Sequence, residues 1–249
     1  VAGQGTVALE MLEQAPELEV LVVPIGGGGL IAGMAVAAKA LKPGIDVVGV
    51  ESKTWCAMYQ RLNGLPVKVG GDTIAEGMAV RDVGELALTL IQKLVNQILI
   101  VEEETIERAI VSLIEIEKTV AEGAGAAGLA ALLQHPGRFA GRRVGIPICG
   151  GNIDSRLLSA VLMRGLVRDG KLVRLCVTMH DVAGSLAKVA AMIGAAGGNI
   201  VEVQHQRVFG TASIKSPAVE FVVETRDREH TRALVEALAA AGVRAGLRE

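Results

Sequence analysis

The stretch Val-Val-Pro-Ile-Gly-Gly-Gly-Gly-Leu, Val22–Leu30, decides how this sequence folds. An apolar run predicts a strand over Val20–Val23, four glycines follow at Gly26–Gly29, and small residues then predict a helix over Leu30–Leu41. Glycines leave backbone N–H groups open to a ligand because they carry no Cβ, and a helix start adds unpaired donors and the positive end of its dipole. The turn is therefore predicted to bind a phosphate group.

A second strand, Asp46–Glu51, follows after a short turn, so the sequence predicts a parallel strand–helix–strand crossover. The pattern Gly27-x-Gly29-x-x-Ala32 satisfies the relaxed dinucleotide fingerprint, and Glu51 stands where an acid would bind a ribose. In a third interpretation, the glycines only permit close packing of the helix on the strand, for which one or two would suffice. The turn alone leaves these interpretations open.

Composition narrows the class of protein. The chain has 249 residues, of which 51% are apolar and 2% aromatic, so its core is built from aliphatic side chains, as in buried parallel sheets. A formal net charge of −2 gives no electrostatic footprint for nucleic acid or for a membrane surface, and no apolar run is long enough for a membrane span. Cys56, Cys149 and Cys176 show neither a disulfide framework nor zinc spacing, so we expect a cytoplasmic protein.

The pattern of elements changes near residue 170. Before it, predicted strands and helices alternate, ending with a strand over Val144–Ile148 that leads into Cys149. After the polar turn Arg168–Lys171, which reads as a linker, the order βαββαβ is typical of a ferredoxin-like domain. We therefore expect a doubly wound, largely parallel α/β domain over residues 1–168 and a smaller one over residues 173–249.

Six motifs in a fixed order carry a family resemblance. They are AGQGT (2–6), VVPIGGGGLIAG (22–33), VVGVE (47–51), TIAEGMA (73–79), EGAGAAGLAAL (122–132) and ICGGN (148–152). Together they resemble the C-terminal half of the fold type II pyridoxal-phosphate enzymes, in particular the threonine dehydratases (threonine ammonia-lyases), with the serine racemases as relatives. The resemblance spans residues 1–165. It implies that the glycine turn binds the phosphate of pyridoxal phosphate.

The smaller domain carries a second resemblance. His180–Ile200 is similar to the first strand–helix–strand of an ACT domain, a module that senses amino acids. This resemblance implies effector-binding residues in the loop after the first strand and at the start of the second, which are Asp181, Gly184, Leu186, Asn199 and Ile200. Alternatively, Asp181 caps the helix and Gly184 only permits the turn.

The resemblance also implies roles for single residues. Gly26, Gly27, Gly28, Gly29 and Leu30 would offer N–H groups to the phosphate. Cys149 matches the residue that faces the pyridine nitrogen, although a free cysteine is often an inert core residue. Glu122 would handle a proton or hold a cation near the cofactor, or else be a carboxylate stabilised at a helix start.

A metal site is the weakest of the implied features. Glu51 matches a metal-binding glutamate of serine racemase, but the aspartate expected six residues later is Ala57 here, which counts against a divalent metal. Backbone carbonyls would still permit a monovalent cation.

The family's cofactor-binding lysine stands in a Ser-x-Lys-x-Arg-Gly context, which no lysine of this chain has. The chain also begins at Val1 rather than Met, so we expect it to be the C-terminal part of a longer protein. The complete protein is expected to be a homo-oligomer that converts L-threonine to 2-oxobutanoate and ammonia, and L-serine to pyruvate, under amino-acid control. The alternatives are a racemase, a nicotinamide-dependent oxidoreductase and a non-catalytic amino-acid sensor.

Overall fold

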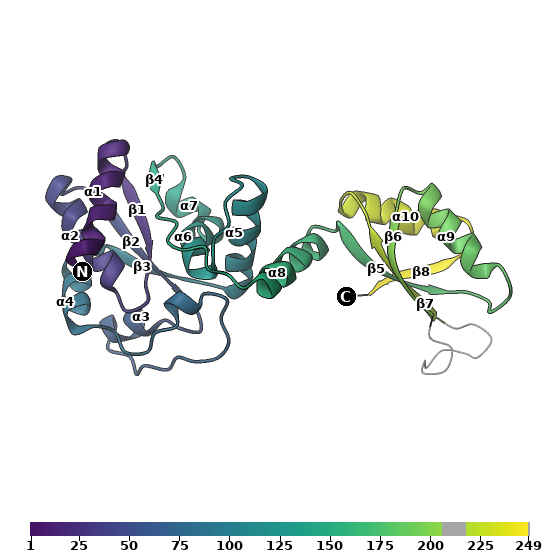
Figure 1. The fold of residues 1–249 in the computed structure, drawn as a ribbon, viewed down its shortest axis with the longest axis horizontal. Helices are drawn as coiled ribbons and strands as arrows, with labels where there is room; N and C mark the ends of the chain where they lie inside the picture. Colours follow the sequence, from purple (N-terminus) through teal and green to yellow (C-terminus); the bar gives the residue numbers. More distant parts are fainter. Residues whose placement is uncertain (206–217, 249) are drawn as a thin grey trace. The chain divides into compact units, whose positions relative to one another are not determined.

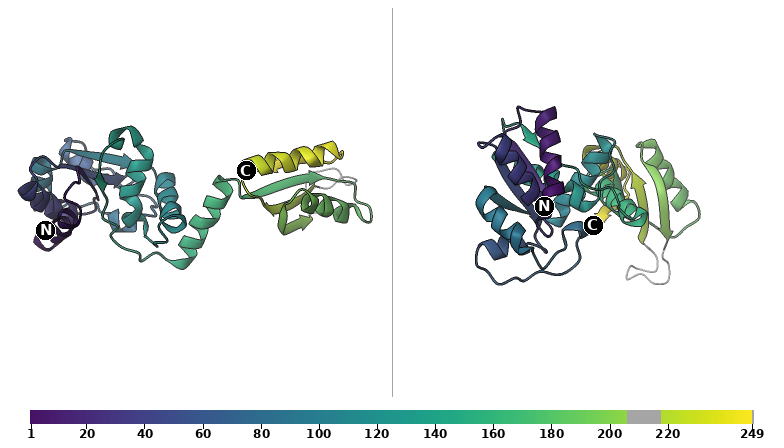
Figure 2. Two further views of the ribbon diagram at one scale, coloured as in Figure 1. Left: turned by 90° about the horizontal axis from the view of Figure 1, so that it is seen from above. Right: turned by 60° about the vertical axis from the view of Figure 1, so that its left-hand side comes forward.

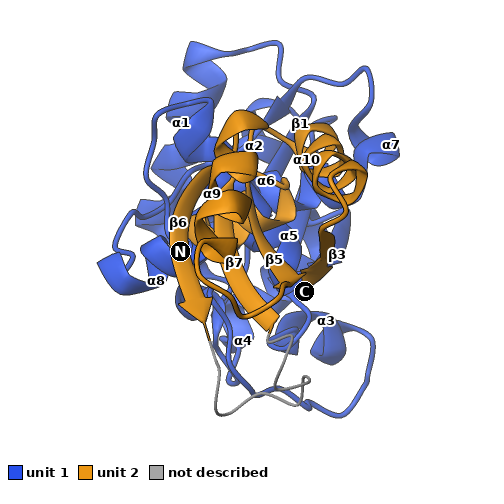
Figure 3. Cartoon of the chain, turned by 90° about the vertical axis from the view of Figure 1, so that its right-hand side faces the viewer, with its two compact units in different colours: residues 1–161 blue, residues 162–249 orange. Residues whose placement is uncertain are grey.

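A computed structural model describes residues 1–205 and 218–248 of the chain. These residues form two compact units, residues 1–161 and residues 162–249, each with its own sheet (Figure 1, Figure 3). The division lies within helix α8, Ser155–Arg168. No described helix is both long and apolar enough to cross a membrane.

Unit 1 is built on a parallel sheet in the order β3-β2-β1-β4. Its strands are β1 (Val20–Pro24), β2 (Asp46–Ser52), β3 (Gln97–Val101) and β4 (Val144–Gly145). All of β1 and nearly all of β2 is buried, as expected for strands that are covered on both faces.

Helices cover both faces of this sheet. The helices of unit 1 are α1 (Gly5–Gln14), α2 (Gly29–Leu41), α3 (Ala57–Leu62), α4 (Glu85–Leu94), α5 (Glu103–Glu115), α6 (Gly123–Gln134) and α7 (Pro136–Phe139), with short 3-10 turns η1 (Ala2–Gln4) and η2 (Glu76–Met78). One face carries α1, α2 and α4, and the other carries α5, α6 and α7 (Figure 1). The predicted doubly wound α/β architecture is confirmed.

The last strand of unit 1 differs from its prediction. The ladder of β4 with β1 ends at Gly145, whereas the sequence predicts a strand to Ile148. Pro147 has no N–H to donate and Gly150 has a φ of +104°, so the chain leaves the extended ladder. Cys149 therefore lies in an irregular segment beyond the strand and not at its carboxyl end.

Unit 2 is an antiparallel sheet with helices on one face. Its elements are β5 (Leu172–Thr178), α9 (Ser185–Ala195), β6 (Asn199–His205), β7 (Ala218–Glu224), α10 (Arg228–Ala240) and β8 (Arg244–Arg248). The sheet order is β6-β7-β5-β8, and alternate residues of β5 and β7 form a core with α9 and α10 (Figure 1, Figure 2). The predicted βαββαβ order is confirmed; residues 206 and 207, the end of the predicted second strand, lie outside the described residues.

The turn that the sequence predicts as a linker is packed within unit 2. The Gly170 carbonyl accepts hydrogen bonds from the Thr225 and Thr231 hydroxyls at 2.5 and 3.2 Å. The Arg228 guanidinium donates to the Arg168 carbonyl at 2.6 Å. All three partners lie more than fifty positions later in the sequence, so tertiary contacts fix the segment that the sequence indicates as a linker.

Candidate functional site

The glycine turn joins β1 to α2 at the carboxyl edge of the unit 1 sheet. The last ladder bond is donated by the Ile25 N–H to the Val50 carbonyl at 2.8 Å, and the four glycines begin directly after it. Gly28 has a φ of +87° and is the N-cap residue of α2, where no side chain caps the helix. This left-handed conformation is open to glycine and costs other residues energy.

Two different physical reasons explain why glycine stands at these four positions. A Cβ on Gly26 would stand 2.8 Å from the Gly77 carbonyl oxygen, and one on Gly28 would stand 2.7 Å from Met58 Cε, so neither position has room for a side chain. A Cβ on Gly27 or Gly29 would meet no protein atom within 4 Å. Packing therefore accounts for two glycines, and the other two leave the backbone open to the approach of a ligand.

The backbone donors of this turn are free to bind an anion. Among residues 1–205 and 218–248, no group accepts a hydrogen bond from the N–H groups of residues 26–31. The first partnered amide of α2 is that of Ala32, which donates to the Gly28 carbonyl. Consecutive N–H groups at a helix start suit a phosphate, because the donors and the helix dipole both favour negative charge. The turn fits the phosphate of pyridoxal phosphate, as the sequence predicts.

The segment 73–79 lies between the glycine turn and the start of α6. A Cβ on Gly77 would stand 3.1 Å from Ala124 Cβ and 3.7 Å from Glu122 Oε1. The Gly77 carbonyl in turn faces Gly26. Three of the sequence motifs are thus in direct contact.

Glu122 is the N-cap residue of α6, but its side chain does not cap the helix. A Cβ on Gly150 would overlap the Glu122 carboxylate, and the Glu122 N–H donates to the Gly150 carbonyl at 3.1 Å. The half-buried carboxylate also lines a pocket of about 290 Å³ with Asn152 and Asp154. This carboxylate lies over the loop that follows Cys149, where it is available to a ligand.

Cys149 is half-buried, and burial raises the pKa of its thiol. Its loop packs on α6, since a Cβ on Gly125 would stand 2.7 Å from the Gly150 oxygen. The glycine turn and this loop follow neighbouring parallel strands, so both lie at the same edge of the sheet. The surroundings of the Cys149 thiol favour its neutral form.

Glu51 has a structural function in this fold. It is 1% exposed, and its two carboxylate oxygens accept hydrogen bonds from the Met58 and Tyr59 N–H groups at 2.9 and 2.8 Å. Such a carboxylate is closed to the ribose of a dinucleotide. The described residues contain no group of three His, Cys, Asp or Glu side chains arranged for a metal ion, so the metal hypothesis for Glu51 gains no support.

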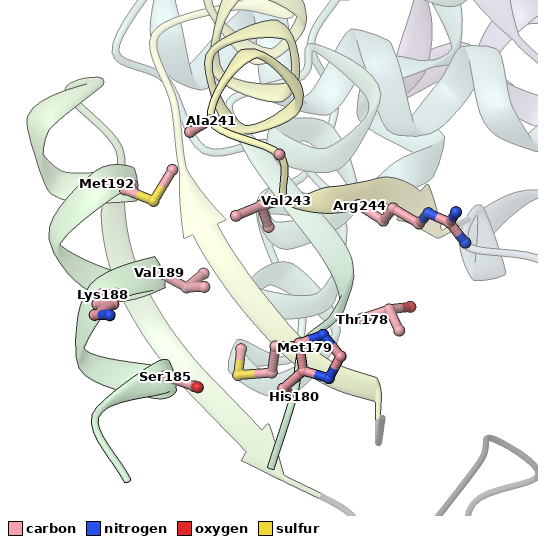
Figure 4. A pocket seen from close by; sticks show the side chains of 11 residues that line it. Thr178, Met179, His180, Ser185, Lys188, Val189, Met192, Ala241, Val243 and Arg244 are labelled. Atoms are coloured by element: carbon pink, nitrogen blue, oxygen red, sulfur yellow. The ribbon is translucent and has the colours of Figure 1, made fainter. Parts of the chain in front are cut away.

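In unit 2, the five residues predicted to bind an effector are spread over the α9 start and β6. Gly184 is the left-handed N-cap residue of α9, and Asn199 donates to the Glu224 carboxylate at 2.7 Å. None of the five lines a pocket of about 540 Å³ in this unit. That pocket lies between α9 and β8, with Met179, Val189 and Val243 facing its interior (Figure 4).

Sequence reasoning missed part of this arrangement. It used the motif TIAEGMA without giving Gly77 a function, and it did not single out Asp154, whose carboxylate accepts from the Arg156 and Leu157 N–H groups beside the Glu122 pocket. The available signal was the glycine inside an otherwise ordinary segment, which often marks a close approach of two backbones.

Comparison with known proteins agrees with this geometry. Residues 1–150 match the family described as pyridoxal-phosphate dependent enzymes. An L-threonine ammonia-lyase from Thermotoga maritima is 38% identical over 244 residues, covering 97% of this chain and 61% of the relative. One from Geobacter sulfurreducens is 39% identical over 247 residues, with coverage of 97% and 61%. The chain thus spans about three fifths of the length of these curated relatives.

Solved structures resemble unit 1. The T.th. threonine deaminase is 36% identical with a TM-score of 0.58, over 61% of this chain and 58% of that one. Maize serine racemase is 35% identical with a TM-score of 0.58, over 67% of this chain and 52% of that one. Since the family match covers more than half of the sequence and the free donors of the glycine turn agree with it, the chain belongs to the pyridoxal-phosphate dependent enzymes.

Proposed function

We propose that this chain is part of an enzyme that deaminates L-threonine to 2-oxobutanoate and ammonia, with L-serine as a second substrate that gives pyruvate. The observation that carries the proposal is the set of free N–H groups at residues 26–31, beside two glycines whose surroundings leave room for a ligand. The threonine ammonia-lyases, similar over 97% of the chain, support this substrate.

The glycine turn binds and orients the cofactor. Gly26 to Gly29 and Leu30 direct their N–H groups at the phosphate, and the positive end of the α2 dipole adds to the attraction. When bound, pyridoxal phosphate supplies an electron sink for the bonds at the substrate Cα. The Cys149 thiol, kept neutral by burial, faces the pyridine nitrogen without placing a charge there.

Glu122 is the proton-handling group of this chain. Its carboxylate is half-buried, makes no capping bond and lines the pocket with Asn152. A carboxylate in such a place can hold a proton at Oε1 and pass it to a substrate atom. The residue that binds the cofactor covalently is expected in the residues upstream of Val1.

We further propose that residues 173–249 form a regulatory ACT-like domain, with residues 1–168 as the catalytic portion. An amino-acid effector binds at Asp181, Gly184, Leu186, Asn199 and Ile200, and the enzyme is a cytoplasmic homo-oligomer. The antiparallel βαββαβ sheet and the extent of the similarity to the Thermotoga maritima relative support this.

The test measures 2-oxobutanoate formation from L-threonine and borohydride trapping of the cofactor, with this chain alone and with a longer protein that includes the upstream residues. Product and a trapped lysine only in the longer protein are the expected result. Product from neither, together with unchanged cofactor absorbance, would overturn the proposal. Formation of D-serine from L-serine without deamination would replace it with racemisation.

A further inference from the structure

The segment 73–79, which separates the glycine turn from Glu122, is held in place from outside the site. Glu103, in the first turn of α5, accepts a hydrogen bond from the Thr73 hydroxyl at 2.6 Å through Oε1. Its Oε2 accepts from the Ile74 N–H at 3.0 Å. Thr73 Oγ1 accepts in turn from the Ala75 N–H at 3.1 Å. One half-buried carboxylate therefore fixes three consecutive residues.

Those three residues lead directly to the site. A Cβ on Gly123, the first residue of α6, would overlap the Ile74 carbonyl, so Ile74 and Ala75 pack on the helix start without a gap. The Met78 N–H donates to the Ala75 carbonyl at 2.8 Å, which closes the turn η2. The turn places the Gly77 carbonyl against Gly26.

We propose that Glu103 is a positioning residue for the glycine turn. By anchoring residues 73–75, it fixes the Gly77 carbonyl against Gly26 and so sets the spacing of the N–H groups that the turn offers to a phosphate. This inference rests on the phosphate-binding function proposed for Gly26–Gly29. Glu103 touches neither the glycine turn nor Glu122 in any described contact; it acts through η2. If residues 73–75 shift, the tightly packed turn η2 passes the shift on to the Gly77 carbonyl, because the turn has no free volume to absorb it.

The neighbouring residue supplies a matched control. Glu102 has the same charge and is the N-cap residue of α5, but its exposed carboxylate pairs with Lys53 at 2.8 Å and makes no described contact with residues 73–75. Glu102→Gln and Glu103→Gln thus remove the same charge at the same helix start. Only Glu103→Gln weakens the contact with residues 73–75. The glutamine side chain keeps one acceptor oxygen and places an NH2 group opposite the other partner, so it cannot accept from both the Thr73 hydroxyl and the Ile74 N–H.

The experiment measures binding of inorganic phosphate, pyridoxal phosphate and pyridoxal to the 249-residue chain by calorimetry. For Glu103→Gln we expect affinity for both phosphate-bearing probes to fall by about tenfold, the scale of one hydrogen bond to a charged group, while pyridoxal binding does not change. Glu102→Gln should bind all three probes as the parent chain does. Amide hydrogen exchange should rise over residues 74–80 in the first variant only.

Two further variants keep the test decisive if Glu103→Gln folds poorly. Thr73→Val removes the bridging hydroxyl at nearly constant volume and should reproduce the loss of phosphate affinity. Thr73→Ser keeps the hydroxyl and should bind phosphate as the parent chain does. Equal phosphate affinity in the parent chain, Glu103→Gln and Thr73→Val would overturn the positioning function of Glu103 but not the phosphate binding proposed for the glycine turn. If the parent chain itself binds no phosphate-bearing probe, the proposed function fails, and this inference fails with it.

Discussion

The helix starts of α2 in unit 1 and α9 in unit 2 have nearly the same backbone but different surroundings. Gly28 and Gly184 are both left-handed N-cap residues, with φ of +87° and +86°, and neither helix has a side-chain cap. Gly28 is buried, and a Cβ there would stand 2.7 Å from Met58; Gly184 is exposed, with open space around it. In unit 1 packing also excludes a side chain at this position, whereas in unit 2 only the left-handed conformation favours glycine.

Carboxylates near helix starts show a parallel contrast. Glu51 accepts from two N–H groups of the α3 region, and Asp227 accepts from the His230 N–H at 2.8 Å as the N-cap residue of α10. Burial raises the pKa of Glu51 to about 7, whereas the His230 N–H lowers the pKa of the exposed Asp227. Burial therefore decides the sign of the shift when the hydrogen bonding is similar.

The largest expected effect is that of Gly28→Ala. The new methyl group would be both strained at positive φ and pressed against Met58 and Ala87, so we expect a loss of roughly 2–4 kcal/mol in the free energy of unfolding. Denaturant unfolding followed by the fluorescence of Trp55, the single tryptophan, reports on unit 1. Gly27→Ala is the control: it should unfold like the parent chain yet bind phosphate more weakly. A stable Gly28→Ala variant would remove the contrast with Gly184.

Glu51→Gln should change how stability depends on pH. The pKa of Glu51 is raised from 4.5 to about 7, so the folded form binds its proton more tightly than the unfolded chain does. Its contribution is full below pH 4.5 and is lost as the pH rises through 7, by roughly 3 kcal/mol in total. Unfolding of the variant should lack this decline between pH 4.5 and 7. An equal decline in the parent and the variant would show that another group causes it.

Gly184→Ala is expected to have a smaller effect than Gly28→Ala. Only the positive φ opposes the methyl group, which costs about 1–2 kcal/mol. Circular dichroism follows this change, because unit 2 contains no tryptophan or tyrosine. A loss as large as that of Gly28→Ala would mean that Gly184 is packed in the folded protein in a way that unit 2 alone does not show.

The smallest effect is expected for Asp227→Asn. The amide oxygen still accepts from the His230 N–H, so stability at neutral pH should hardly change. The lowered pKa of Asp227 makes its contribution present above pH 3.8 and lost as the pH falls further, the reverse of Glu51. Acid titration of the variant by circular dichroism should show a shallower loss of unit 2 structure. A steeper loss would contradict the assignment.

Much of the architecture was predictable because its signals are local. The buried run of β1 and the four glycines after it predict the strand, the turn and the crossover, and the βαββαβ order follows from regular spacing in the second half. The end of β4 was predicted wrongly, and the turn at Gly170, which the sequence indicates as a linker, is fixed by hydrogen bonds within unit 2. The contacts of the turn reach residues more than fifty positions away, which no local pattern indicates, whereas the end of β4 follows from Pro147 and the positive φ of Gly150.

The candidate site was predictable in its motifs but not in its contacts. The sequence indicated the glycine turn, Glu122 and Cys149 as functional residues. It did not distinguish Gly27 and Gly29, which leave room for a ligand, from Gly26 and Gly28, which packing requires. Nor did it indicate the anchor at Glu103, because the bonds of that carboxylate reach residues about thirty positions away.

The sequence by itself determined the parallel sheet, the donors of the glycine turn and the composition of the second unit, because propensity, periodicity and glycine conformations act over a few residues. Only the tertiary structure decided which glycines are crowded, where the Glu122 carboxylate lies and why Glu51 is closed to a ligand. Those properties depend on burial and on contacts between distant segments, and the same residue types have opposite properties when the surroundings change.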